Sequence, residues 1–83
     1  MALDRTELLQ YLSERFAVSV DGLGDEEPLF SSGLLDSFNV TELVLYIEER
    51  SGRFVDPDDL SFENLDSVAR ILRFASALSE RGR

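Results

Sequence analysis

The hexapeptide Gly33-Leu34-Leu35-Asp36-Ser37-Phe38 separates a long irregular segment from the most strongly patterned helix of the sequence. Asp36 has a short acceptor side chain, which suits it to capping the free N–H groups of a first helical turn. Ser37 then begins the helix, where we expect its hydroxyl to face solvent and the N–H groups and helix dipole to favour a phosphate. A bare Asp-Ser pair is most often only a cap, so the surrounding sequence decides between these interpretations.

The residues from Ser37 to Ser51 predict a helix that ends before Gly52. At about 100° per residue, one group of apolar residues forms a single stripe that faces the core: Val40, Leu43, Val44 and Ile47. The opposite side carries an apolar pair with carboxylates beside it: Phe38, Leu45, Glu42 and Glu49. Such a pair on the outer face of a helix indicates a docking surface. In the alternative interpretation, the long loop covers the pair.

The residues before the hexapeptide predict one helix and one long loop. Asp4 and Glu7 have the spacing of a capping box, so we expect a helix over about residues 5–17. Residues 18–35 lack periodicity and are rich in glycine and acidic residues, which indicates a long loop for so small a chain. Three apolar side chains are expected to hold this loop against the core: Leu23, Leu29 and Phe30.

The residues after Gly52 predict a short helix and a longer one. Pro57 after Asp56 favours the start of a short helix III, and Asn64 is suited to capping the last helix. The apolar residues of that last helix share one face: Leu65, Val68, Ile71, Leu72, Ala75 and Leu78. We therefore expect an all-α fold, a small four-helix bundle with three main helices, a short helix III and a long first loop, in a single domain over residues 1–83.

The composition excludes several classes of function. The 83 residues contain no histidine, cysteine or lysine, so Ser37 has no conventional base to activate it, and we do not expect an enzyme. The same absences argue against zinc, and Asp56–Asp59 fails as a calcium loop because Ser61 and Ser67 stand where glycine and glutamate are required. A net charge of −9 disfavours nucleic acid. With no signal peptide and no long apolar run, we expect no membrane insertion and a cytoplasmic location.

The hexapeptide and the helix after it resemble the modification site of acyl carrier and peptidyl carrier proteins; the matching helix residues are Val40, Glu42, Leu43, Val44 and Ile47. The resemblance extends over nearly the whole chain, because those proteins have about this length and one long loop before the Asp-Ser helix. It implies that Ser37 receives 4′-phosphopantetheine from coenzyme A and carries acyl or aminoacyl groups as thioesters on that arm. It also implies a role for Asp36 in the metal-assisted transfer.

The resemblance further implies a set of partner enzymes. These are a phosphopantetheinyl transferase, an acyl- or aminoacyl-loading enzyme, and a downstream acyltransferase or synthase, all meeting a monomeric carrier. The residues expected to bind them are Phe38, Thr41, Glu42, Leu45 and Glu49.

The residues around Asp36 indicate a subtype. Fatty-acid carriers usually have a glycine and a small residue before the aspartate and an acidic residue where this chain has Asn39, whereas here two leucines precede Asp36. The chain is more similar to D-alanyl carrier proteins and to stand-alone carriers of specialised, polyketide- or peptide-type biosynthesis. The cargo stays open among aminoacyl, polyketide-starter and other short acyl groups. One alternative of another class also stays open, namely a non-catalytic acidic interaction module in which Ser37 is an ordinary helix cap.

Overall fold

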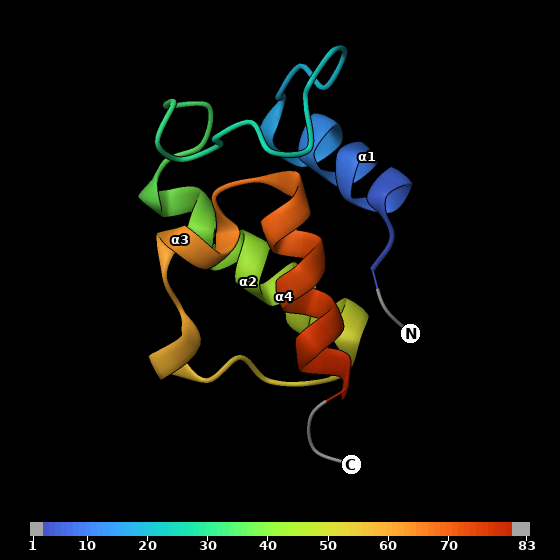
Figure 1. Cartoon of the computed structure of the whole chain (residues 1–83), viewed down its shortest axis with the longest axis vertical. Helices are drawn as coiled ribbons and strands as arrows, with labels where there is room; N and C mark the ends of the chain where they lie inside the picture. Colours follow the sequence, from blue (N-terminus) through green and yellow to red (C-terminus); the bar gives the residue numbers. More distant parts are fainter. Residues whose placement is uncertain (1–2, 81–83) are drawn as a thin grey trace.

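The computed structural model describes residues 3–80, with side chains through residue 78, and shows a small helical bundle (Figure 1). Its elements are α1 (Arg5–Phe16), α2 (Ser37–Ser51), the 3-10 helix η1 (Pro57–Asp59), α3 (Phe62–Leu65) and α4 (Val68–Glu80). The described residues contain no strand, which confirms the predicted all-α fold class. None of these helices is long and apolar enough to cross a membrane.

The core lies where α4 packs against the other three α-helices. Its fully buried apolar residues come from all four α-helices and from the long loop: Leu8, Leu12, Leu29, Leu43, Ile47, Leu65, Val68 and Ile71. On α2, the predicted stripe is confirmed, since Leu43 and Ile47 are completely buried and Val40 and Val44 are partly buried against them. This packing decides which side of α2 faces outward.

The ends of α1 and α2 follow local capping rules. The Asp4 side chain accepts a hydrogen bond from the Glu7 N–H at 2.8 Å, as the sequence predicts. The first helix ends at Phe16, one residue earlier than expected, because Ala17 takes a left-handed conformation with φ 56°. At the end of α2, Gly52 adopts φ 73° and its N–H bonds to the Glu48 carbonyl, a conformation in which glycine has no side chain to strain.

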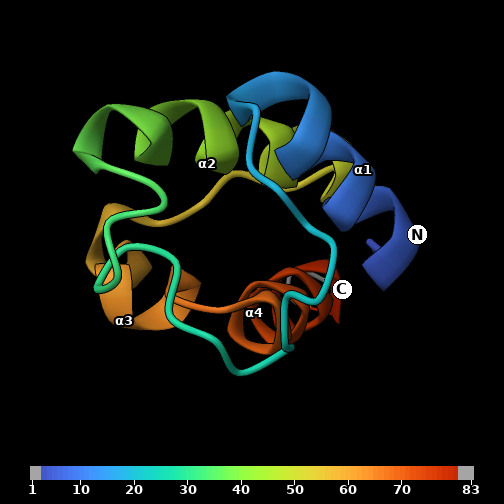
Figure 2. The ribbon, with the colours of Figure 1, turned by 90° about the horizontal axis from the view of Figure 1, so that it is seen from above.

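The loop from residue 17 to residue 36 is held against the bundle. As expected, Leu23 and Leu29 are buried and Phe30 is half-buried. Figure 2 shows the loop passing from the end of α1 across α4 and α3 before it returns to the start of α2. Backbone hydrogen bonds fasten it there, with the Ala69 N–H donating to the Asp25 carbonyl at 2.8 Å.

The last part of the chain differs from the prediction. The short third helix is split into η1 and α3, and Asn64 and Leu65 belong to α3 and not to the last helix. Helix α4 begins at Val68, where the Ser67 hydroxyl accepts a hydrogen bond from the Arg70 N–H at 3.1 Å. In a continuous helix, the Asp66 carbonyl would accept that N–H. Instead it accepts the Leu29 N–H from the long loop at 2.7 Å, and this tertiary contact interrupts the helix.

Candidate functional site

The start of α2 is held by a reciprocal capping box. The Asp36 Oδ1 atom accepts hydrogen bonds from the N–H groups of Phe38 at 2.9 Å and Asn39 at 3.3 Å. In return, Asn39 Oδ1 accepts the Asp36 N–H at 2.9 Å. Each residue therefore satisfies backbone groups that the helix leaves open, and the first helical residue, Ser37, is set in a defined position.

The Ser37 side chain is exposed and its hydroxyl makes no hydrogen bond to any described residue. Asp36 caps the helix, so the interpretation of Ser37 as an ordinary cap is wrong. The neighbouring loop serines differ from it, because the Ser31 hydroxyl donates to Asp66 Oδ2 at 2.5 Å and the Ser32 hydroxyl donates to the Pro28 carbonyl at 2.7 Å. Ser37 thus differs from these two neighbouring serines, because its hydroxyl makes no hydrogen bond to the described residues.

The helix start offers a phosphate fewer donors than we expected from sequence. The Asp36 carboxylate already occupies the N–H groups of Phe38 and Asn39. Both bonds go to Oδ1, and Oδ2 accepts none from the described residues. This corner of the molecule therefore presents a free hydroxyl beside a free carboxylate oxygen. No group of three or more histidine, cysteine or acidic side chains in residues 3–78 is arranged to hold a metal ion.

A carboxylate between α3 and α4 clamps the loop that leads to this site. The Asp66 Oδ1 atom accepts the N–H groups of Leu29 at 3.1 Å, Phe30 at 2.7 Å and Ser31 at 3.0 Å, in addition to the Ser31 hydroxyl on Oδ2. These hydrogen bonds, that of the Ser31 hydroxyl above all, hold the pKa of Asp66 below its usual value. We did not predict this clamp from sequence. The available signal was the pair Asp66-Ser67, two weak helix formers inside the expected last helix.

An aromatic hollow of about 450 Å³ adjoins Ser37. It is lined by Phe30, Ser31, Gly33, Leu35, Asp36, Ser37 and Phe62. The rings of Phe30 and Phe62 lie with their centroids 5.3 Å apart and tilted by 33°. Because Phe30 comes from the long loop and Phe62 from α3, this arrangement could not be read from the sequence.

The outer face of α2, consisting of Phe38, Thr41, Glu42, Leu45 and Glu49, is open to solvent along most of its length. The side chain of Phe38 is 84% exposed and that of Leu45 is 59% exposed, so the long loop does not cover the apolar pair. Thr41 and Glu49 are also exposed, whereas Glu42 is partly shielded. The role of these residues in binding partners remains a prediction.

Glu42 is shielded because α1 pairs with it. The Arg15 Nε and Nη2 atoms donate to its two carboxylate oxygens, and this pairing raises the pKa of Arg15. Tyr11 donates its hydroxyl to the Glu42 carbonyl at 3.2 Å and stacks on Tyr46 with ring centroids 3.7 Å apart. Glu49 makes no ion pair with any side chain that the structure describes.

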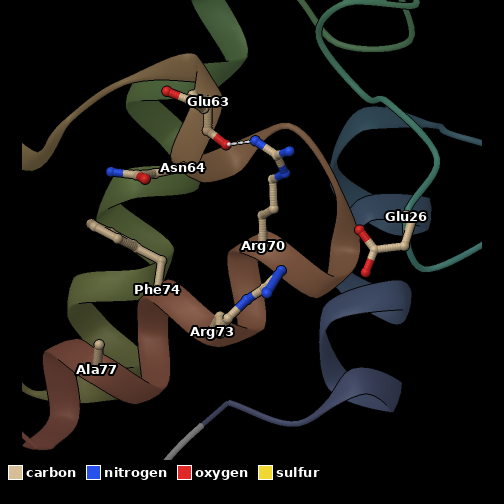
Figure 3. A pocket seen from close by; sticks show the side chains of 7 residues that line it. All are labelled: Glu26, Glu63, Asn64, Arg70, Arg73, Phe74 and Ala77. Atoms are coloured by element: carbon tan, nitrogen blue, oxygen red, sulfur yellow. Dashed lines mark hydrogen bonds between the residues drawn. The ribbon is translucent and has the colours of Figure 1, made fainter.

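A second hollow, of about 680 Å³, lies against α3 and α4 and is lined by Glu26, Glu63, Asn64, Arg70, Arg73, Phe74 and Ala77 (Figure 3). Here Arg70 donates to the Glu63 carbonyl at 2.9 Å. None of the site residues predicted from sequence lines this hollow. The aromatic hollow and the outer face of α2 therefore remain the surfaces associated with Ser37.

Comparison with known protein families places this geometry in context. A family model described as "Phosphopantetheine attachment site" matches residues 5–75, which include α1, the long loop, α2, α3 and most of α4. No curated protein and no solved structure matches the chain significantly. The free Ser37 hydroxyl, at the start of a helix and beside an apolar hollow, fits a covalently attached group of this kind.

Proposed function

Because the chain belongs to the phosphopantetheine-attachment family, whose members bear 4′-phosphopantetheine covalently, we propose that Ser37 is the residue that carries this group. One observation supports Ser37 over its neighbours: its hydroxyl is exposed and unbonded among the described residues, whereas the hydroxyls of Ser31 and Ser32 are engaged. When bound, the group supplies a terminal thiol on a flexible arm, on which acyl or aminoacyl groups are held as thioesters.

The chain provides the anchor and relies on a partner for the chemistry. It contains no histidine, lysine or cysteine to take the Ser37 proton, so a phosphopantetheinyl transferase must supply the base. The free Oδ2 atom of Asp36 lies next to the attachment point and is suited to a divalent cation held by that transferase, since carboxylate oxygens are the ligands that Mg²⁺ prefers. The capping bonds through Oδ1 keep this carboxylate oriented.

We further propose that residues 1–83 act as one carrier domain without catalytic activity of its own. A loading enzyme attaches the acyl or aminoacyl group and a downstream acyltransferase or synthase removes it, both docking on the outer face of α2. Leu34 and Leu35 before Asp36 favour a carrier of specialised polyketide- or peptide-type biosynthesis, or one similar to D-alanyl carriers. The exposed Phe38 and Leu45 support docking on this face.

The attachment is tested by incubating the purified chain with coenzyme A and a phosphopantetheinyl transferase, followed by intact-protein and peptide mass spectrometry. We expect one added phosphopantetheine, located on Ser37 and absent from Ser37→Ala. Ser31→Ala is the matched control, because it removes a nearby hydroxyl and should still be labelled. Far-ultraviolet circular dichroism of Ser37→Ala should match the wild type, since the hydroxyl makes no hydrogen bond to the described residues. Labelling that persists in Ser37→Ala would contradict the assignment.

A further inference from the structure

We propose that the aromatic hollow is a resting site for the pantoyl segment of the group carried on Ser37, the part next to the phosphate whose quaternary carbon bears two methyl groups. This inference rests on the proposed attachment at Ser37. It goes beyond that attachment by assigning Phe30, Leu35 and Phe62 a role in holding the arm.

The position of the hollow selects which part of the arm it can receive. Ser37 and Asp36 themselves form part of its lining, so the hollow begins at the attachment point. The pantoyl segment follows directly after the phosphate, whereas the thiol lies at the far end of the arm. A group anchored on Ser37 therefore brings its two methyl groups to the hollow before any other carbon branch.

The lining of the hollow suits hydrocarbon better than amides. Phe30, Leu35 and Phe62 contribute apolar side chains. Apart from the Ser37 hydroxyl and Asp36 Oδ2 at the attachment point itself, the polar side-chain atoms of the lining are already used. The Ser31 hydroxyl donates to Asp66 and Asp36 Oδ1 accepts two N–H groups of α2. The amides of the arm would lose their hydrogen bonds to water in such a site, whereas the two methyl groups have none to lose.

The walls of the hollow are held in place without the arm. The Phe30 N–H is bonded to Asp66, which also anchors its neighbours in the loop. The Phe62 ring lies against that of Phe30 and follows Ser61, whose hydroxyl caps α3. A preformed site lowers the cost of ordering a flexible ligand. The proximal arm is thus retained near α3, while its amides and thioester stay in water, where a partner enzyme can reach them.

Nuclear magnetic resonance of the holo protein tests this directly, after mass spectrometry has established that Ser37 is loaded. We expect the two pantoyl methyl signals to shift upfield relative to free pantetheine, because they lie near aromatic rings. We also expect nuclear Overhauser effects from these methyl groups to the rings of Phe30 and Phe62. The effects at Phe62 should disappear in Phe62→Ala, and the upfield shift should shrink.

Phe54→Ala is the matched control, because Phe54 is 89% exposed and does not line the hollow. This variant should keep the shift and both sets of Overhauser effects. Phe62 is itself 53% exposed, so its removal should leave the fold intact, which circular dichroism checks. If the pantoyl methyl signals of loaded wild type keep the chemical shifts of free pantetheine, this inference is overturned while the proposed function is not. The inference is also overturned if an attached acyl group, and not the pantoyl methyl groups, contacts the rings of Phe30 and Phe62. Failure to load Ser37 would instead overturn the proposed function.

Discussion

Arg15 on α1 and Glu42 on α2 form a bidentate ion pair, with distances of 2.8 Å from Nε to Oε2 and 2.7 Å from Nη2 to Oε1. Two parallel bonds give an arginine–carboxylate pair a defined geometry. The side chains remain 58% and 41% exposed, so the pair contributes little to the free energy of unfolding. Its main consequence concerns charge: Arg15 neutralises the Glu42 carboxylate, whereas no described side chain forms an ion pair with Glu49.

The two carboxylates of the outer face should therefore act differently on recognition. We expect Glu49→Gln to weaken the salt dependence of loading by the transferase more than the double substitution Arg15→Gln/Glu42→Gln does, because the double substitution removes an ion pair with no net charge. The measurement is the loading rate of each variant and of the wild type across a series of ionic strengths. Arg15→Gln provides the complementary variant, since freeing Glu42 should make the salt dependence steeper. Equal slopes in all four proteins would show that this face does not guide the encounter.

Apolar contact at Leu45 should matter more than either charge. A buried apolar anchor at an interface can contribute about 2 kcal/mol or more, whereas an exposed ion pair contributes about 0.2–1 kcal/mol. We therefore expect Leu45→Ala to lower the kcat/KM of loading further than Glu42→Gln does, through a raised KM. Leu60→Ala is the control, because Leu60 is also exposed but follows η1 and lies outside this face. A loss of the same size in both leucine variants would argue against docking on α2.

Leu43 should contribute strongly to the stability of the bundle. Its side chain is completely buried on the core stripe of α2, and truncating such a leucine costs about 2–5 kcal/mol. In a domain this small, the loss is a large fraction of the total free energy of unfolding. Thermal and urea denaturation should show a large drop for Leu43→Ala and a change within about 0.5 kcal/mol for the exposed Leu45→Ala. Similar melting curves for the two variants would mean that α2 is rotated relative to this structure.

The Asp66 clamp should make stability depend on pH. Hydrogen bonds hold the pKa of Asp66 below its usual value of 3.8, so its carboxylate stabilises the folded state at pH values above that value. This contribution is lost as the pH falls from 3.8 through the lower pKa of the folded state. We expect Asp66→Asn to melt at a lower temperature than wild type at pH 7.

The difference between the two melting temperatures should narrow as the pH falls below 3.8. Protonation then removes from Asp66 of the wild type the negative charge that Asp66→Asn removes at every pH. A series of thermal melts between pH 7 and pH 2.5 measures this. Asp21→Asn controls for the loss of one negative charge, because the Asp21 side chain is exposed and makes no hydrogen bond or ion pair to the described residues. Parallel pH profiles for wild type and Asp66→Asn would contradict a stabilising role of the ionised carboxylate.

Much of the structure around α2 could be predicted from the sequence, because it depends on local interactions. The bounds of α2, its buried stripe and its exposed Phe38 and Leu45 follow from helical periodicity, because each depends on residues within a few positions of one another. The same holds for Asp36 as the cap and for the exposed position of Ser37. These features sufficed to identify the family, which the match over residues 5–75 confirms. Attachment at Ser37 itself remains to be tested.

The features that only the tertiary structure decided join residues far apart in the chain. Asp66 meets Ser31, and by accepting the loop's N–H groups it separates Leu65, which belongs to α3, from the rest of the predicted last helix, which forms α4. Arg15 reaches Glu42 and so leaves Glu49 as the unpaired carboxylate of the outer face among the described side chains. Periodicity and capping involve only near neighbours, so they determined where α2 begins and which side it buries. They carry no information about which loop N–H groups or which arginine come to lie beside a given carboxylate, because chain packing brings those groups together.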